Sequence, residues 1–163
     1  MNRRSRGATL VELVITIVII SVAIAGVVGA FALISGRSAD PLNETRAVAL
    51  AQLYMDEIIT QKYDDQTPQG GVPRYNGGCS IGPEGSETRS TFDDVDDYDG
   101  LNDSPPASAL SVLSGYSGFS VAVTVVCAGD EVGLPVSQAK RIDLTVSAPA
   151  DSQFVFSAYR ANF

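Results

Sequence analysis

The sequence predicts an α+β fold in which a long N-terminal helix, first membrane-spanning and then amphipathic, packs on a small antiparallel β-sheet. Three observations lead to this prediction. Residues 13–34 are almost all apolar or small. Within residues 41–63, apolar side chains recur every three or four positions, which indicates a helix with one buried face. Three segments within residues 118–161 alternate apolar and polar residues, as the strands of a half-buried sheet do.

The first apolar run is long enough to cross a membrane. As a helix it extends about 33 Å, and the hydrocarbon core of a bilayer is roughly 30 Å thick. Glu12 is the only charged residue between Gly7 and Arg37. A secretory signal peptide and a plain single-pass anchor are alternatives for this stretch. Signal peptides, however, have apolar regions of only about 7–15 residues. Neither alternative explains Glu12, because an ionisable residue inside a membrane span is costly.

Charge predicts the orientation of the span. Three arginines, Arg3, Arg4 and Arg6, precede it, and the chain after it is acidic, with a net charge of −8 for the whole sequence. Basic residues favour the cytoplasmic side of a membrane. We therefore expect the N-terminus in the cytoplasm and most of the chain on the other side of the membrane.

The segment RGATLVEL, residues 6–13, resembles the processing site of type IV pilins and of the pseudopilins of type II secretion. The resemblance implies that residues 1–7 are a basic leader and that residues 8–35 form a transmembrane and filament-core helix. It also implies that a prepilin peptidase cuts between Gly7 and Ala8 and methylates the new N-terminus on Ala8. Ala8 departs from the family, which usually has phenylalanine there. The implied partners are the prepilin peptidase, the inner membrane and other pilins, which contact the N-terminal helix in the pilus.

Glu12 has a physical role in this scheme. Cleavage leaves a free amine on Ala8, and side-by-side packing of apolar helices would bury that amine. An isolated buried charge costs several kcal/mol, whereas a paired one is tolerated. We therefore predict that Glu12 of one subunit neutralises the amine of a neighbour and acts in assembly.

Residues 36–163 are predicted to form one extracytoplasmic head domain, since their number suits a single hydrophobic core. The prediction divides this head into an amphipathic helix (41–63), an irregular acidic loop (64–103) and a β-meander (about 118–161). One face of the meander is apolar and needs a cover, and the amphipathic helix is the available element.

Cys79 and Cys127 are the only cysteines. Outside the cytoplasm they could form a disulfide that ties the irregular loop to the first clear strand. Two buried free thiols and a metal site are the alternatives.

The segment FDDVDDYDG, residues 92–100, is the second distinctive feature. Its five carboxylates could surround Ca²⁺, which takes six to eight oxygen ligands; they belong to Asp93, Asp94, Asp96, Asp97 and Asp99. The segment does not fit an EF-hand loop, because Val95 stands at the first ligand position when Gly100 is set at the sixth. A solvated acidic loop is the alternative. Calcium is the only cofactor that the sequence suggests.

Two further segments narrow the resemblance. LAQLYMDEI (residues 50–58) and FDDVDDYDGL (residues 92–101) resemble segments of the D-type minor pilins of mannose-sensitive haemagglutinin (MSHA) pili. The resemblance implies a subunit present in few copies that helps to start or cap the pilus and supports attachment of the cell to surfaces.

Other functions are disfavoured by what the sequence lacks. It contains no histidine, which excludes Ser-His-Asp and Cys-His nucleophile systems and histidine metal sites. It has no phosphate-binding loop and no basic patch for nucleic acid. We therefore expect a protein that is not an enzyme. Three functions remain: a minor pilin, a pseudopilin of a secretion or DNA-uptake system, and a membrane-anchored extracytoplasmic binding module.

Overall fold

A computed structural model describes residues 9–37 and 40–163, which fall into two compact units with a boundary between Leu42 and Asn43. The first unit contains helix α1 (Leu10–Arg37). By length and composition, Leu10–Ala32 is the one stretch of the described chain that could cross a membrane as a helix. Every side chain of residues 9–32 is exposed. The predicted leader and Ala8 lie outside the described residues.

Helix α2 (Asp40–Ile59) has the predicted buried face. This face consists of Ala47, Leu50, Ala51, Tyr54 and Ile58. The helix ends at Ile59 rather than at residue 63, because the following backbone pairs with the acidic segment instead. The Lys62 N–H donates to the Asp93 carbonyl at 3.3 Å, and the Val95 N–H donates to the Lys62 carbonyl at 3.1 Å.

The sheet contains four antiparallel strands arranged in chain order. They are β1 (Asn102–Asp103), β2 (Ser120–Cys127), β3 (Ala139–Ala148) and β4 (Ser152–Ala161). The α+β prediction is confirmed. The sequence analysis did not predict β1, a two-residue strand that pairs with β2 through Asn102 and Asp103.

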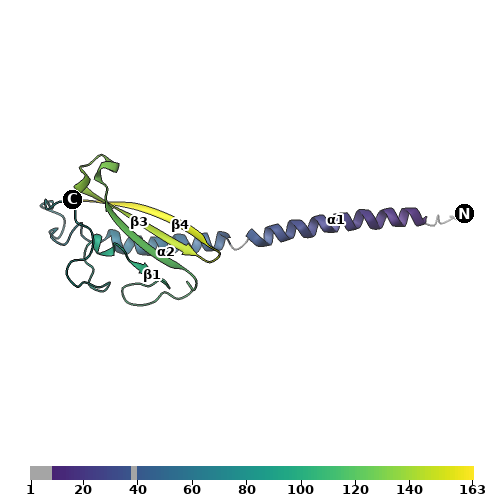
Figure 1. The fold of residues 1–163 in the computed structure, drawn as a ribbon, viewed down its shortest axis with the longest axis horizontal. Helices are drawn as coiled ribbons and strands as arrows, with labels where there is room; N and C mark the ends of the chain where they lie inside the picture. The colour runs from purple at the N-terminus through teal and green to yellow at the C-terminus, as the bar shows by residue number, and fades with distance from the viewer. Residues whose placement is uncertain (1–8, 38–39) are drawn as a thin grey trace, which may run out of the picture. The chain divides into compact units, whose positions relative to one another are not determined.

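One face of the sheet packs on α2, which runs along it (Figure 1). Alternate residues of the two central strands supply this face, namely Val121, Val123, Val125, Ile142, Leu144 and Val146. Each buried aliphatic side chain contributes about 1.5–3 kcal/mol relative to an exposed one. Val95 and Tyr98 from the irregular loop join the same core. The acidic loop is therefore built into the head.

Arg89 fastens the irregular loop to α2. Its guanidinium donates to Glu57 of α2 at 3.2 Å and also bonds to Asp103 of β1. The same group lies over the Tyr54 ring, 4.9 Å from the ring centroid. This one side chain thus connects a helix, a strand and the loop, and it holds the acidic segment in a defined place.

Candidate functional site

Thr9 caps the N-terminus of α1. The Glu12 N–H donates to Thr9 Oγ1 at 3.3 Å, and the Leu13 N–H donates to the Thr9 carbonyl at 3.2 Å. A threonine followed three residues later by glutamate is the capping-box pattern, which satisfies N–H groups that have no partner within the helix. The TLVE part of the processing motif is therefore also a helix-start signal, which the sequence analysis missed although its spacing was readable.

The cap places Glu12 in the first turn of α1. Its side chain is exposed, and the partial positive charge of a helix N-terminus favours a carboxylate at this position. The predicted cleavage and methylation residues, Gly7 and Ala8, lie outside the described residues. The structure thus fixes where Glu12 stands on its own helix, and the pairing of Glu12 with an amine remains a prediction.

The acidic segment is largely buried, so the alternative of a solvated loop is wrong for its central residues. Asp94 and Asp96 are 0% exposed and Asp97 is 1% exposed. Asp96 forms an ion pair with Lys140 of β3, whose side chain is also fully buried. Lys140 Nζ donates in addition to the Tyr63 carbonyl at 2.6 Å. A buried charge on Asp96 is therefore matched by a buried positive charge.

The backbone wraps around one oxygen each of Asp94 and Asp97. Asp94 Oδ1 accepts the N–H groups of Asp96 and Asp97 at 2.9 and 3.2 Å. Asp97 Oδ2 accepts the N–H groups of Asp93 and Asp94 at 2.9 and 3.2 Å. These bonds explain the short 3-10 helix η1 (Asp96–Tyr98) in the segment. The second oxygen of each of the two carboxylates is buried and has no hydrogen-bond partner within the described part of the chain.

The five predicted calcium ligands do not converge on one point. Asp93 Oδ2 pairs with Lys62 Nζ at 2.6 Å. Asp99 Oδ1 accepts the Val125 N–H of β2 at 2.8 Å, so this carboxylate holds the loop against the sheet. Asp93, Asp94 and Asp97 do bring one oxygen each to within 4.8 Å of one another.

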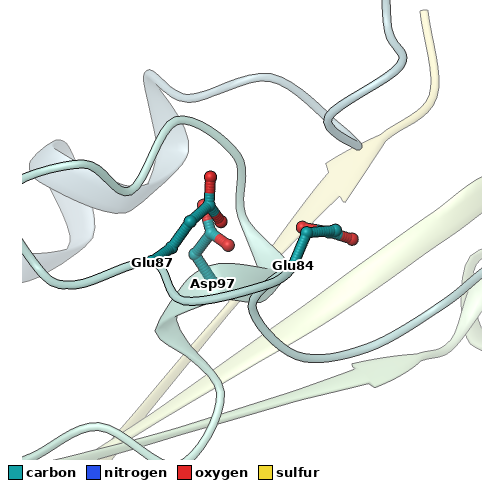
Figure 2. Close-up of side chains that lie close together, drawn as sticks. All are labelled: Glu84, Glu87 and Asp97. Atoms are coloured by element: carbon teal, nitrogen blue, oxygen red, sulfur yellow. The ribbon is translucent and has the colours of Figure 1, made fainter.

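Glu84 and Glu87 complete the acidic cluster, and the sequence analysis did not single them out. Glu84, Glu87 and Asp97 each place one carboxylate oxygen within 4.8 Å of the others, and Figure 2 shows the Glu87 and Asp97 carboxylates side by side. Glu84 forms a second such group with Asp94 and Asp96. The spacing of the two glutamates from the aspartates follows no regular pattern in the sequence. Only the fold brings the two segments together, so sequence reasoning could not find this cluster.

Burial and neighbouring carboxylates raise the pKa values of Asp94, Glu84 and Glu87. Burial, then the nearby carboxylates of Asp96 and Asp97, raise the pKa of Asp94 to about 7, and Lys140 opposes this shift. The Asp97 carboxylate, followed by desolvation, raises the pKa of Glu87. Desolvation and then the charges of Asp94 and Asp97 raise the pKa of Glu84. Such a cluster holds either protons or a hard cation.

A disulfide holds an earlier part of the irregular loop. Cys79 and Cys127 are joined with an S–S length of 2.03 Å and a Cα–Cα separation of 6.2 Å. Cys127 is the last residue of β2, so the bond ties the loop to the sheet. The structure therefore pairs the two cysteines, and neither is a free thiol.

Comparison with known proteins gives one match, at the N-terminus. Residues 2–28 match the family model of the prokaryotic N-terminal methylation motif. The searches of curated proteins and of solved structures find no match. The matched motif is the processing site of prepilins and belongs to structural subunits rather than to enzymes. Together with a helix able to span a membrane and an α+β head, it supports a type IV pilin-like or pseudopilin subunit.

Proposed function

We propose that this chain is a minor pilin of a type IV pilus of the MSHA kind. In this proposal a prepilin peptidase cuts it between Gly7 and Ala8 and methylates Ala8. Helix α1 holds it in the inner membrane, with the N-terminus in the cytoplasm and the head outside. The subunit then enters or caps the filament, helps pilus assembly and supports attachment to surfaces.

The observation that carries the proposal is the exposed apolar helix α1, which begins within the matched methylation motif. Every side chain of residues 9–32 is exposed in the single chain, and nearly all of them are apolar. A surface of this size is covered either by lipid or by other helices. A filament subunit uses both covers in turn, first the membrane and then the apolar helices of its neighbours.

Glu12 supplies the specificity of that packing. It is the one acidic residue of α1, and it stands in the first turn, close in sequence to the proposed new amine. In a bundle of apolar helices, an amine and a carboxylate pair because each is costly to bury alone. The pairing would set the axial stagger of one subunit against the next.

The finer assignment to the MSHA kind rests on the sequence resemblance of two segments of the head. The two segments that carry this resemblance, residues 50–58 and 92–101, pack in one core. Tyr98 Oη donates to Glu57 Oε1 at 3.2 Å, which joins one segment to the other. The resemblance therefore covers one connected part of the fold rather than two unrelated patches.

The test uses Glu12→Gln in cells that carry the other pilus components. Glutamine retains the capping-box pattern with Thr9 and removes the charge. The variant is expected to be cut like the wild-type chain, to remain in the membrane and to be at least about tenfold depleted from sheared pili, because the amine loses its ionic partner. Immunoblotting of the two fractions measures this.

Two control variants separate charge from helix structure. Thr9→Ala weakens the cap by about 1 kcal/mol and keeps the carboxylate, so it should enter pili far better than Glu12→Gln. Ser21→Ala changes a polar residue further along the same helix and should enter pili normally. Wild-type amounts of Glu12→Gln in sheared pili would rule out the pairing.

Deletion of the chain separates a minor pilin from a pseudopilin. A minor pilin predicts fewer surface pili and poorer attachment, with normal protein secretion. Normal pili with blocked secretion or DNA uptake would favour the pseudopilin function instead.

A further inference from the structure

We propose that Glu84, Glu87, Asp94 and Asp97 form a binding site for one Ca²⁺ ion in the head. The four carboxylates come from two separate stretches of the irregular loop, a surface turn and the buried acidic segment. The site belongs to the second compact unit, whereas the processing motif and Glu12 belong to the first, and the site does not depend on the proposed filament function.

Buried carboxylate oxygens without partners point to a ligand. Asp94 Oδ2 and Asp97 Oδ1 belong to side chains that are at most 1% exposed, and they have no hydrogen-bond partner among residues 9–37 and 40–163. Glu87 is partly exposed, but its Oε2 atom at the edge of the cluster is also buried and has no hydrogen-bond partner among the described residues. A buried carboxylate oxygen that accepts no bond is costly. A bound cation would supply the partner that these three oxygens need.

Three overlapping groups bring the carboxylates into one region of the head. Glu84, Glu87 and Asp97 have one oxygen each within 4.8 Å of one another, a second group consists of Asp93, Asp94 and Asp97, and a third consists of Glu84, Asp94 and Asp96. Oxygens that share one Ca²⁺ at 2.3–2.6 Å lie at most about 5 Å apart. Figure 2 shows Glu84 and Glu87 on one turn, with Glu87 facing Asp97.

The lysines beside the cluster are already engaged with other acids. Lys62 pairs with Asp93, and Lys140 pairs with Asp96. Asp93 and Asp96, which the sequence suggested as ligands, are therefore neutralised by lysine. Neither lysine forms an ion pair with the four proposed ligands. A divalent ion would therefore balance negative charge that the two lysines do not neutralise.

The donor set favours calcium over magnesium. All donors are oxygens, and they sit on irregular backbone rather than on one rigid element. Asp94 and Asp97 each use one oxygen for backbone N–H groups and have one left. Glu84 and Glu87 lie on the surface turn and are able to bind through one or both oxygens. Mg²⁺ demands near-ideal octahedral geometry, whereas Ca²⁺ accepts six to eight oxygens in flexible arrangements.

Proton sharing between neighbouring carboxylates is the competing account. Glu87 and Asp97 could share one proton, and so could Asp94 and Asp96, without any metal. In that case calcium would leave the stability of the protein unchanged at neutral pH. The two accounts therefore differ in a direct measurement.

The experiment is calorimetric titration of the full chain in detergent micelles with CaCl₂, repeated with MgCl₂ at equal ionic strength. We expect one Ca²⁺ per chain with a Kd of about 10⁻⁴–10⁻³ M, the range of extracellular modules, and weaker binding of Mg²⁺. Glu84→Gln and Glu87→Gln remove ligand charge on the surface turn and should each weaken binding roughly tenfold. Glu44→Gln, an exposed residue of α2, is the matched control and should bind like the wild type.

Thermal unfolding of each variant in EDTA verifies that the head is folded. Added calcium should then raise the melting temperature of the wild type and of Glu44→Gln. Absence of calcium binding by folded wild-type protein would overturn the proposal. So would wild-type affinity in folded Glu84→Gln and Glu87→Gln, since the ion would then be held elsewhere.

Discussion

At the scale of single residues, Asp94 makes the head sensitive to pH in the absence of metal. Its pKa is raised from 3.8 to about 7, first by burial and then by Asp96 and Asp97, against the opposing charge of Lys140. The folded state therefore holds a proton that the unfolded state releases near pH 4. The stabilising contribution is fully present below that pH and is lost as the pH rises through about 7.

We predict that, in EDTA, the free energy of unfolding falls by about 1–3 kcal/mol between about pH 5 and about pH 8. Urea denaturation of the full chain in micelles at several pH values measures it. Glu84, Glu87 and Asp96 shift in the same direction and add to the slope. Asp94→Asn should flatten the profile, and an unchanged slope in this variant would contradict the assignment to Asp94.

Some of the charged residues that matter in the structure could be predicted from the sequence, and others could not. Glu12 stood out because it is an isolated charge in an apolar run. Glu84 and Glu87 did not, because their partners are distant in sequence and only the fold brings them together. Lys140 was also hidden: a lysine at the start of a strand is usually solvated, and its burial depends on Asp96 and the Tyr63 carbonyl.

At the scale of elements, Arg89 connects the irregular loop to α2 and to β1 through ion pairs with Glu57 and Asp103. It is 15% exposed, and it serves Glu57 and Asp103, which are similarly buried. Arg89→Ala would leave both carboxylates without their cation and is predicted to destabilise the head by about 2–4 kcal/mol.

Thermal and urea unfolding of the full chain measure this change. Arg46→Ala is the matched control. Arg46 is an exposed residue of α2, and its substitution should change the free energy of unfolding by less than about 0.5 kcal/mol. Equal stability of the two variants would show that Arg89 does not fasten the loop. Arg89→Lys should recover little of the loss, because lysine cannot make the forked contacts to two acids.

The disulfide constrains the same loop at a second point, Cys79. Cys79 and Cys127 are 48 residues apart. Closing a loop of this length stabilises a protein by about 4 kcal/mol in the chain-entropy model. We predict that Cys79→Ser/Cys127→Ser lowers the free energy of unfolding by roughly that amount without changing the far-ultraviolet circular dichroism. Equal urea midpoints for the double variant and the oxidised wild type would contradict this.

The regular elements were predictable because their periodicities were clean. The three- and four-residue spacing in α2 and the alternation in β2, β3 and β4 depend only on which residues face the core. The early end of α2 was not predictable, since it results from backbone pairing of Lys62 with the acidic segment. Strand β1 has only Asn102 and Asp103, residues of low strand propensity, and it exists because β2 offers pairing partners.

At the scale of the whole molecule, the exposed apolar helix and the folded core of the head belong to different compact units. One unit presents an apolar helix with every described side chain of residues 9–32 exposed. The other has its own core between α2 and the sheet, closed by the acidic loop. Substitutions in the head should therefore alter stability and calcium binding, whereas removal of the Glu12 charge should alter assembly.

The central claim is that the chain matures by cleavage on the cytoplasmic side of its apolar helix. Intact-mass analysis of the protein purified from membranes tests this most directly. The account predicts a polypeptide that begins at Ala8 and carries one methyl group on its N-terminal amine. A membrane-bound protein whose mass corresponds to a start at Met1 or Asn2, in cells with an active prepilin peptidase, would contradict it.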